Sequence, residues 1–234
     1  MPMRNYFIYD GENSKDYGLY INGLELYGSP ARNIDTVEVP GRNGSVLFDR
    51  KSYPDKPMTL KNCFIYDNFN RNLAGVRNWL GLKFGYKRME TSYFPEEFYL
   101  AYMPNGIEPA MMENLRAGTF DISLMRRPER FLKIGELPIE ITSGAELHNP
   151  GGPAKPLIYT EGNGTLHVGP TDLTITGAVD YTYIDCEAQD CYRLKTENKN
   201  SLMTGDFPTI QAGDTTITYS GFTKVEITPR WWIL

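Results

Sequence analysis

Few side chains in this chain of 234 residues could do acid–base chemistry. The two histidines, His148 and His167, stand in no Ser, Cys or carboxylate pattern of a catalytic family. Carboxylates gather at Asp185, Glu187 and Asp190, and glycoside hydrolysis requires a pair of carboxyl groups. A solvated loop that follows a strand has the same composition. We interpret these residues as surface features, keep cell-wall hydrolysis as the weakest alternative, and expect no catalytic residue.

Metal ligands do not stand at a recognisable spacing either. The acidic cluster lacks the regular oxygen ladder of an EF-hand calcium loop. Cys63, Cys186 and Cys191 have neither C-x-x-C spacing nor the histidines that would complete a zinc site. Three cysteines cannot all pair, so we expect free thiols in a reducing cytoplasm. We expect no metal and no cofactor.

Glycines and tyrosines give two further indications. Gly41 and Gly44 flank Arg42 and Asn43, but no Lys-Ser/Thr pair and no strand-to-helix transition follows, which excludes a phosphate-binding loop. The 16 tyrosines suit sandwich cores, protein interfaces and stacking on sugars. Interface use is the broader interpretation, and sugar binding stays open.

Charge divides the chain into two parts. Residues 1–133 hold 18 Lys+Arg against 16 Asp+Glu, whereas residues 134–234 hold 6 against 13, so the net charges are +2 and −7. Nucleic-acid binding requires clustered Lys and Arg, which argues against it for the second part. No apolar run approaches the ~18 residues of a membrane helix, and the N-terminal residues lack the apolar core of a secretory signal. We expect a soluble protein with two domains, 1–133 and 134–234.

Short alternating segments dominate the first domain, and their β-branched and aromatic residues are typical of strands. They are residues 17–21, 34–39, 45–48, 59–66, 98–103 and 120–125. The pair Asn43-Gly44 tolerates positive φ and therefore predicts a tight hairpin reversal. The sequence predicts a mostly antiparallel sheet.

One segment has a helical period. Phe69, Leu73, Val76 and Leu80 recur at a spacing of three to four residues, with polar residues between them. This predicts a single amphipathic helix over residues 68–82, packed across the sheet by its apolar face. The first domain should therefore be α+β.

The second domain has no helical period. Its expected strands are residues 156–160, 165–168, 173–176, 181–185, 215–219 and 224–228. Short strands at regular spacing, separated by Gly- and Asn-rich turns, are typical of a β-sandwich. The fold class is thus mainly β with one helix.

Ordered fragments along the chain resemble one family. In the second domain they are Asn149-Pro150-Gly151, Pro156-Leu157-Ile158-Tyr159, Gly162-Asn163-Gly164, Tyr183-Ile184-Asp185-Cys186-Glu187, Gly205-Asp206-Phe207-Pro208, Gly213-Asp214 and Glu226-Ile227-Thr228-Pro229-Arg230-Trp231-Trp232; in the first they are Val39-Pro40-Gly41-Arg42-Asn43-Gly44 and Tyr53-Pro54-Asp55. In their order and spacing they resemble the distal tail (Dit) proteins of siphophages, or of prophages, that infect Gram-positive bacteria. The matches span nearly the whole chain.

This resemblance implies a structural role. It implies an N-terminal β-sandwich with a helix that assembles into a homo-hexameric ring, followed by a galectin-like β-sandwich. The ring would join the tail tube to the host-adsorption apparatus, beside the tail-tube protein, the tape-measure protein and a tail-associated lysin, adhesin or receptor-binding protein, and DNA would pass through it without specific binding. The location would be the virion tail tip, after assembly in the host cytoplasm, without membrane insertion.

The alternative is a carbohydrate-binding module for a host cell-wall saccharide. The compact second domain has no evident inserted carbohydrate-binding module, which weakens a direct role in host recognition. Sugar binding by residues 135–234 remains the test of this alternative.

Two regions are the candidate structural sites. We expect the hairpin region with Arg42, Asn43 and Tyr53 to contact neighbouring subunits. Trp231 and Trp232 are expected to be a structural anchor, because adjacent strand residues point to opposite faces and cannot form one flat sugar platform. If the last strand runs through residues 225–234, one indole faces a core and the other an outer surface.

Overall fold

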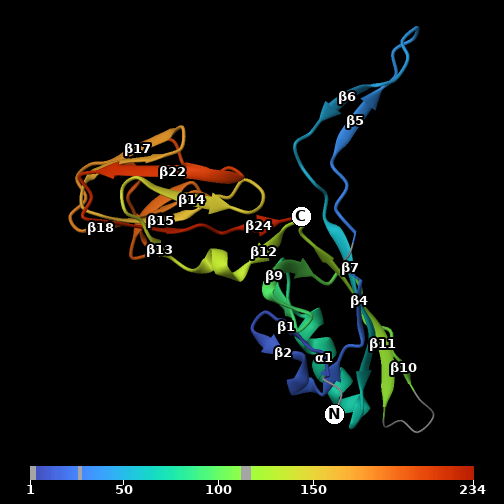
Figure 1. The fold of residues 1–234 in the computed structure, drawn as a ribbon. Coiled ribbons are helices and arrows are strands. Elements are labelled where there is room, and N and C mark those ends of the chain that lie inside the picture. Colours follow the sequence, from blue (N-terminus) through green and yellow to red (C-terminus); the bar gives the residue numbers. More distant parts are fainter. Residues whose placement is uncertain (1–3, 26–27, 112–116) are drawn as a thin grey trace. The chain divides into compact units, whose positions relative to one another are not determined.

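A computed structural model describes residues 4–25, 28–111 and 117–234 of the protein. The chain folds into two units: Met1–Arg130 together with Leu234, and Phe131–Ile233. Both are built mainly of antiparallel strands, and one α-helix lies within the described ranges (Figure 1). The expected fold class, mainly β with one helix, is confirmed.

An antiparallel sheet forms the body of the first unit. Its strands lie in the order β2-β1-β8-β9-β11-β7-β3, with β10 paired to β11 and β4 to β7. The bounds are β1 (Phe7–Tyr9), β2 (Glu12–Asn13), β3 (Leu19–Tyr20), β4 (Gly23–Glu25), β7 (Lys56–Ile65), β8 (Lys87–Thr91), β9 (Phe94–Tyr102), β10 (Ala110–Met111) and β11 (Gly118–Arg126). The expected strand at residues 17–21 is partly wrong, because Ser14–Tyr17 form a 3-10 helix that Gly18 ends at φ 63°.

A bulge keeps the long strand β7 on the core. Met58 and Leu60 are buried, and the alternation then shifts by one residue so that Cys63 and Ile65 are buried too. Asn62 absorbs the extra residue at φ 49°, a left-handed conformation that asparagine tolerates. Its backbone N–H donates to the Asp121 carboxylate across the sheet at 2.8 Å.

Helix α1 (Phe69–Gly81) covers one face of this sheet. The predicted helix over residues 68–82 is confirmed, and its predicted apolar face is buried. Trp79 extends that face: its ring stacks on Phe7 at 5.3 Å and on Tyr17 at 4.7 Å between centroids, and its Nε1 donates to the Tyr9 carbonyl at 3.2 Å. The indole therefore joins the helix to both the first strand and the 3-10 turn.

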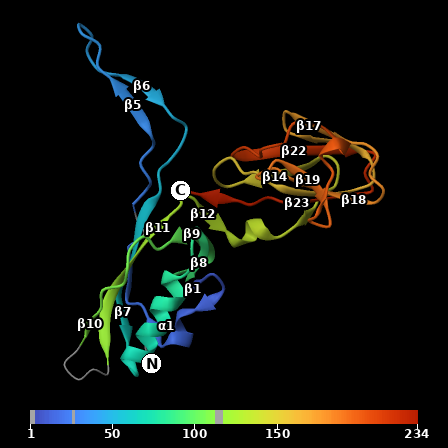
Figure 2. The same ribbon diagram turned by 180° about the vertical axis from the view of Figure 1, so that it is seen from behind.

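The hairpin of β5 (Ile34–Val37) and β6 (Val46–Asp49) stands apart from the unit's main sheet (Figures 1 and 2). The two strands pair with each other in a separate sheet. A hairpin here is confirmed, but the tight reversal expected at Asn43-Gly44 is wrong. The connection spans residues 38–45, and Gly41 and Gly44, both at φ 80°, provide the left-handed conformations. Glycine adopts positive φ without steric cost because it carries no Cβ, which suits it to this long connection.

The second unit is a β-sandwich. One sheet has the order β13-β23-β15-β18-β19-β20 and the other β14-β22-β16-β17-β21. The bounds are β13 (Ile139–Glu140), β14 (Ala145–Asn149), β15 (Leu157–Glu161), β16 (Gly164–Val168), β17 (Thr171–Ile175), β18 (Tyr181–Asp185), β19 (Asp190–Arg193), β20 (Glu197–Asn198), β21 (Met203–Gly205), β22 (Gly213–Ser220) and β23 (Lys224–Thr228), with β12 (Arg130–Leu132) at the entry, β24 (Trp232–Ile233) at the end, and 3-10 turns at Lys133–Glu136 and Asn200–Leu202.

Alternate residues of these strands fill the interior. Ile158, Leu166, Ile184 and Ile227 are fully buried, while their sequence neighbours are exposed to some degree. This period of two is what a strand with one buried face requires. The apolar interior of the sandwich belongs to the second unit alone.

Candidate assembly interface

The β5–β6 hairpin exposes apolar side chains on both of its faces. Directly opposed residues share a face, so Thr36 lies with Leu47 on one face and Asp35 with Phe48 on the other. Leu47 is 64% exposed and Phe48 56%. An isolated two-stranded hairpin is marginally stable in water, and exposed apolar patches mark interaction sites. Both faces of this hairpin are therefore surfaces for a partner to cover.

Ion pairs and backbone bonds hold the hairpin in shape. The Arg32 guanidinium binds Asp49 through two hydrogen bonds of 2.8 and 2.5 Å, and it lowers the pKa of that carboxyl. Arg50 Nε donates to the Asp35 carboxylate at 2.7 Å. At the base, the Asn33 N–H donates to the Ser52 carbonyl at 3.0 Å. These pairs are exposed and screened by salt, so they fix geometry more than they stabilise the fold.

The three residues expected to make subunit contacts lie at different places along the hairpin. Arg42 and Asn43 are exposed in the 38–45 connection, where Arg42 also lines a shallow hollow with Glu38. Tyr53 lies beyond the other end, between β6 and β7, and is half-buried. The structure thus places Arg42 and Asn43 on the hairpin and Tyr53 outside it, and it does not bring the three together. Sequence reasoning missed Leu47 and Phe48, whose exposure shows only in the fold.

Trp231 is buried in the core of the second unit, with 5% of its surface exposed. The Leu132 N–H donates to its carbonyl at 2.9 Å, and the Arg230 N–H donates to the Gly135 carbonyl at 2.7 Å. A Cβ on Gly135 would lie 2.4 Å from the Trp231 nitrogen, which explains glycine there. The end of the chain is therefore packed against the segment that begins this unit.

Trp232 is half-buried beneath the segment of Gly151 and Gly152, which we call the glycine strap. Its Nε1 donates to the Pro153 carbonyl at 3.0 Å, and its own carbonyl accepts from the Gly152 N–H at 3.0 Å. A Cβ on Gly152 would lie 2.1 Å from the indole. The strap is shaped by Asn149, whose amide donates to the carbonyls of Gly152 and Ile210 at 2.8 and 2.9 Å.

The expected strand at residues 224–228 is confirmed as β23, but it does not run on continuously to residue 234. β23 ends at Thr228, Arg230 takes φ 59°, and pairing resumes at Trp232 in β24. Pro229 cannot donate a ladder hydrogen bond, which favours the break. The interruption lets Arg230 turn toward Asp185 instead of extending the sheet.

The acidic cluster is used for local structure. Asp185 accepts from Arg230 Nη1 and Nη2 at 2.7 and 2.9 Å, and Arg230 is the main cause of its lowered pKa. It also accepts the backbone N–H groups of Glu187 and Ala188. Glu187 pairs with Lys155 at 3.3 Å. Within the described ranges, no group of three or more His, Cys, Asp or Glu residues could hold a metal ion.

Both histidines have carboxylate partners that the sequence did not reveal. His148 Nδ1 lies 2.6 Å from Asp214 Oδ1, and His167 Nδ1 lies 2.6 Å from Asp172 Oδ1. Each pair is formed by directly opposed residues of neighbouring strands. All four side chains are exposed, so these are cross-strand surface pairs.

Tyrosines line the outer face of the second unit. Tyr159, Tyr183 and Tyr192 are directly opposed on β15, β18 and β19, with ring centroids 5.1 and 5.6 Å apart. Tyr181 stacks on Tyr159 at 5.7 Å. Such cross-strand aromatic pairs stabilise a sheet. Because the rings pack on one another, they are not a single flat platform for a sugar.

The architecture, a helix-bearing β unit followed by a β-sandwich, is similar to that of solved proteins from phage baseplates and adsorption apparatus. A solved structure with this fold is the Dit protein of phage SPP1, described as a paradigm of the hub of the adsorption apparatus in phages that infect Gram-positive bacteria; the match has a TM-score of 0.77 at 12% identity and covers 99% of this chain and 100% of that one. The baseplate of phage p2 in its activated conformation, with Sr or with Ca, contains chains that match at TM-scores of 0.56 and 0.55, at 9% identity, over 96% of this chain and 97% of theirs.

Sequence comparison adds nothing to this likeness. No family model matches the chain, and no curated protein matches it. At 9 to 12% identity the shared feature is the fold. No α-helix in the described part of the chain is long and apolar enough to cross a membrane.

Proposed function

We propose that the protein is a non-enzymatic structural hub of a phage or prophage tail tip, forming a hexameric ring between the tail tube and the host-adsorption apparatus. One observation carries this proposal: the likeness to the SPP1 Dit hub extends over 99% of the chain with a TM-score of 0.77. Fold alone does not define function. The uncovered apolar hairpin supplies the second argument, since it requires a partner.

In the proposed ring, the first unit makes the contacts between subunits. Each subunit extends its β5–β6 hairpin, with Arg42 and Asn43, onto a neighbour, and Tyr53 beyond the base of the hairpin adds to the contact, so that contacts of one kind close a cycle. Trp231 and Trp232 anchor the chain end within the second unit. The near-neutral charge of residues 1–133 suits a lumen through which DNA passes, because clustered cations would retain the phosphates. The ring would meet the tail-tube and tape-measure proteins on one side and a lysin, adhesin or receptor-binding protein on the other, at the virion tail tip after assembly in the host cytoplasm.

Assembly tests the proposal directly. We expect light scattering and negative-stain imaging of the purified chain, alone or with the tail-tube protein, to show closed rings. Replacing the two exposed apolar residues, in the variant Leu47→Glu/Phe48→Glu, should abolish rings because a carboxylate on each face cannot be buried without a partner.

The matched control is Leu194→Glu, which places a charge at a residue of similar exposure, 56%, in the second unit. It should assemble as the wild type does. A strictly monomeric wild type at high concentration, with no ring after the tail-tube protein is added, contradicts the hub role. Rings that survive the hairpin variant unchanged contradict the proposed contact and leave the hub role standing.

A further inference from the structure

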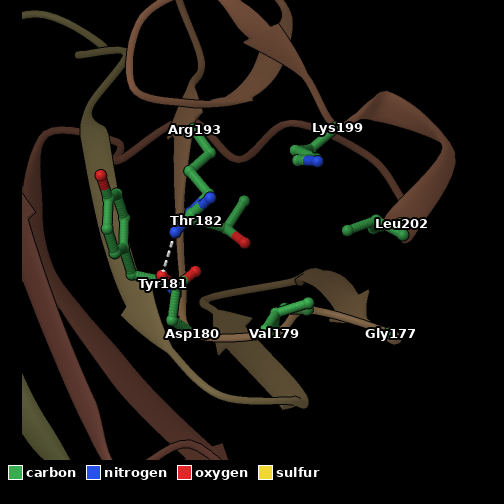
Figure 3. Close-up of a pocket in the computed structure, with 9 residues that line it drawn as sticks. Gly177, Val179, Asp180, Tyr181, Thr182, Arg193, Lys199 and Leu202 are labelled. Atoms are coloured by element: carbon green, nitrogen blue, oxygen red, sulfur yellow. Dashed lines mark hydrogen bonds and ion pairs between the residues drawn. The ribbon is translucent and has the colours of Figure 1, made fainter.

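A small pocket opens between the two sheets of the second unit. It has a volume of about 50 Å³ and is lined by the 177–180 loop, by β18, and by Arg193, Lys199 and Leu202. In the close-up of Figure 3, the Thr182 side chain points into the space bounded by Leu202 and Val179. The pocket is far below the roughly 300 Å³ or more of sites that enclose a whole ligand. It can admit a substituent of a ligand that lies across its mouth.

Two polar atoms at this pocket are buried and have no hydrogen-bond partner among the described residues. They are Thr182 Oγ1 and Arg193 Nε. Thr182 as a whole is 1% exposed. An unpaired buried hydroxyl costs folding free energy, so native proteins retain few of them without a reason. The pocket therefore offers unused hydrogen-bonding capacity from two adjacent strands.

Charges around the pocket are mixed and balanced. The Arg193 guanidinium binds the Asp180 carboxylate and lies 3.7 Å from Glu197, and the Lys199 ammonium lies 3.2 Å from Glu197. Two cations thus face two carboxylates. A strongly charged ligand would find no net attraction here, whereas a neutral polyol would find both donors and acceptors. A sugar hydroxyl both donates and accepts hydrogen bonds, so it can use both kinds of group.

Apolar surface completes the site. Arg193 packs over the Tyr181 ring, 5.4 Å from its centroid. Val179 at the tip of the loop is 96% exposed, and Leu202 is half-buried on the opposite wall. An apolar wall beside converging polar groups is the usual composition of a small-molecule site.

The walls are held in place before any ligand arrives. The Asn163 side chain bonds the loop twice: its amide donates to the Ala178 carbonyl at 3.1 Å and its Oδ1 accepts the Ala178 N–H at 2.7 Å. The Gly162 N–H donates to the Asp180 carbonyl at 2.7 Å. Such preorganisation reduces the entropy lost on binding.

We propose that this pocket binds a neutral saccharide, with one hydroxyl-bearing substituent inserted between Thr182 and Arg193 and the pyranose ring lying against Val179. Thr182 Oγ1 and Arg193 Nε bond the inserted hydroxyl, and Lys199 and Asp180 bond its neighbours. The inference concerns the second unit alone and does not depend on ring assembly.

Saccharide binding is tested on the full chain by saturation-transfer difference NMR, which tolerates monomer and ring alike. The probes are free hexoses, N-acetylhexosamines and deoxyhexoses, with inorganic phosphate as the charged comparison. We expect a saturable signal from at least one pyranose. Adding inorganic phosphate should not reduce that signal. Thr182→Val should weaken binding at least tenfold while melting at the same or a higher temperature, because it replaces an unpartnered buried hydroxyl with a methyl.

Two further variants locate the site. Arg193→Lys keeps a charge but removes Nε and should weaken binding similarly. Thr174→Val makes the same chemical change on β17, where the hydroxyl pairs with Thr165 at 3.0 Å outside the pocket, and should bind as the wild type does. No signal from any sugar with folded protein overturns the proposal, as does a signal that persists in both Thr182→Val and Arg193→Lys, or displacement of the sugar by phosphate.

Discussion

At the scale of single residues, the chain end shows how two identical side chains acquire different roles. Trp231 is enclosed by the core of the sandwich, whereas Trp232 lies half-buried under the strap of Gly151 and Gly152. The Trp231 backbone lies against Gly135 and the Trp232 indole against Gly152, and each approach is close enough to require glycine. The burial of Trp231 and the close packing of Trp232 against Gly152 support their interpretation as a structural anchor.

Truncating the two tryptophans should therefore have unequal effects. Trp231→Ala removes a buried aromatic side chain and is expected to cost ~3 to 5 kcal/mol of unfolding free energy. Trp232→Ala should cost less, since part of its ring is already in water, and should affect assembly more than folding. Urea denaturation followed by CD measures the unfolding free energy of both variants. Equal and small losses for the two variants would contradict the assignment of Trp231 to the core.

The Asp185–Arg230 pair makes a pH-dependent contribution. The pKa of Asp185 is lowered in the folded state, chiefly by Arg230, so the stabilisation is present above the ordinary carboxyl pKa of about 3.9 and is lost as pH falls through the lower folded value. Asp185→Asn should cost roughly 2 kcal/mol at neutral pH. The gap from wild type should narrow progressively as pH falls below about 4 and close only below the folded pKa.

Thermal melts from neutral pH to about pH 2 measure this gap across the range in which the carboxyl titrates. Glu187→Gln is the control, since Glu187 makes one exposed ion pair with Lys155, and its melting curve should follow the wild type. An Asp185→Asn deficit that persists undiminished in acid would show that geometry rather than charge is lost.

At the scale of elements, helix and sheet meet at a position that only glycine fits. A Cβ on Gly118 in β11 would lie 2.3 Å from the Phe69 ring at the start of α1. Gly118→Ala should overpack this junction and cost about 1 to 3 kcal/mol. Gly106→Ala, where a Cβ meets nothing within 4 Å, is the neutral control in the same denaturation experiment.

A double variant separates overpacking from a backbone effect. Phe69→Leu shortens the facing side chain, so Gly118→Ala should cost less in that background than alone. Strict additivity of the two changes would place the cost in the backbone of β11 instead.

The sequence predicted elements whose pattern is local. Helix α1 has an unbroken apolar stripe, and β15, β18 and β23 alternate cleanly, so each could be placed from its period alone. Strand β1 was missed because its three residues are too short to show a period, and β8 was missed because Met89 is its one apolar residue. The break at Pro229 and the bulge at Asn62 could not be placed from the sequence. Each depends on a hydrogen bond to a residue far along the chain: Arg230 binds Asp185, and the Asn62 N–H donates to Asp121.

Site residues were less predictable for the same reason. The hairpin was expected, but the exposure of Leu47 and Phe48 shows only in the structure, where β5 and β6 pair with each other in a sheet of their own. Likewise, the pocket at Thr182 depends on Leu202 and Lys199, which only the fold brings to β18. A site whose residues come from several strands shows no characteristic residue spacing in the sequence.

At the scale of the whole molecule, the β5–β6 hairpin should be dispensable for folding and essential for assembly. It contributes no side chain to either buried core, and its ends already meet, because the Asn33 N–H donates to the Ser52 carbonyl at 3.0 Å. Replacing residues 34–51 with a short Gly-Asn turn should therefore close the chain without strain. The expected product melts within a few degrees of the wild type, as for changes that leave a core intact.

The same deletion should leave only monomers in light scattering and no rings in negative stain. Sugar signals, which come from the second unit, should persist and serve as the control for native folding. A deletion variant that still forms rings would move the interface to the main sheet of the first unit. An isolated hairpin of this length contributes little by itself, so a deletion variant that fails to melt cooperatively would contradict the prediction and mean that the hairpin supports the fold.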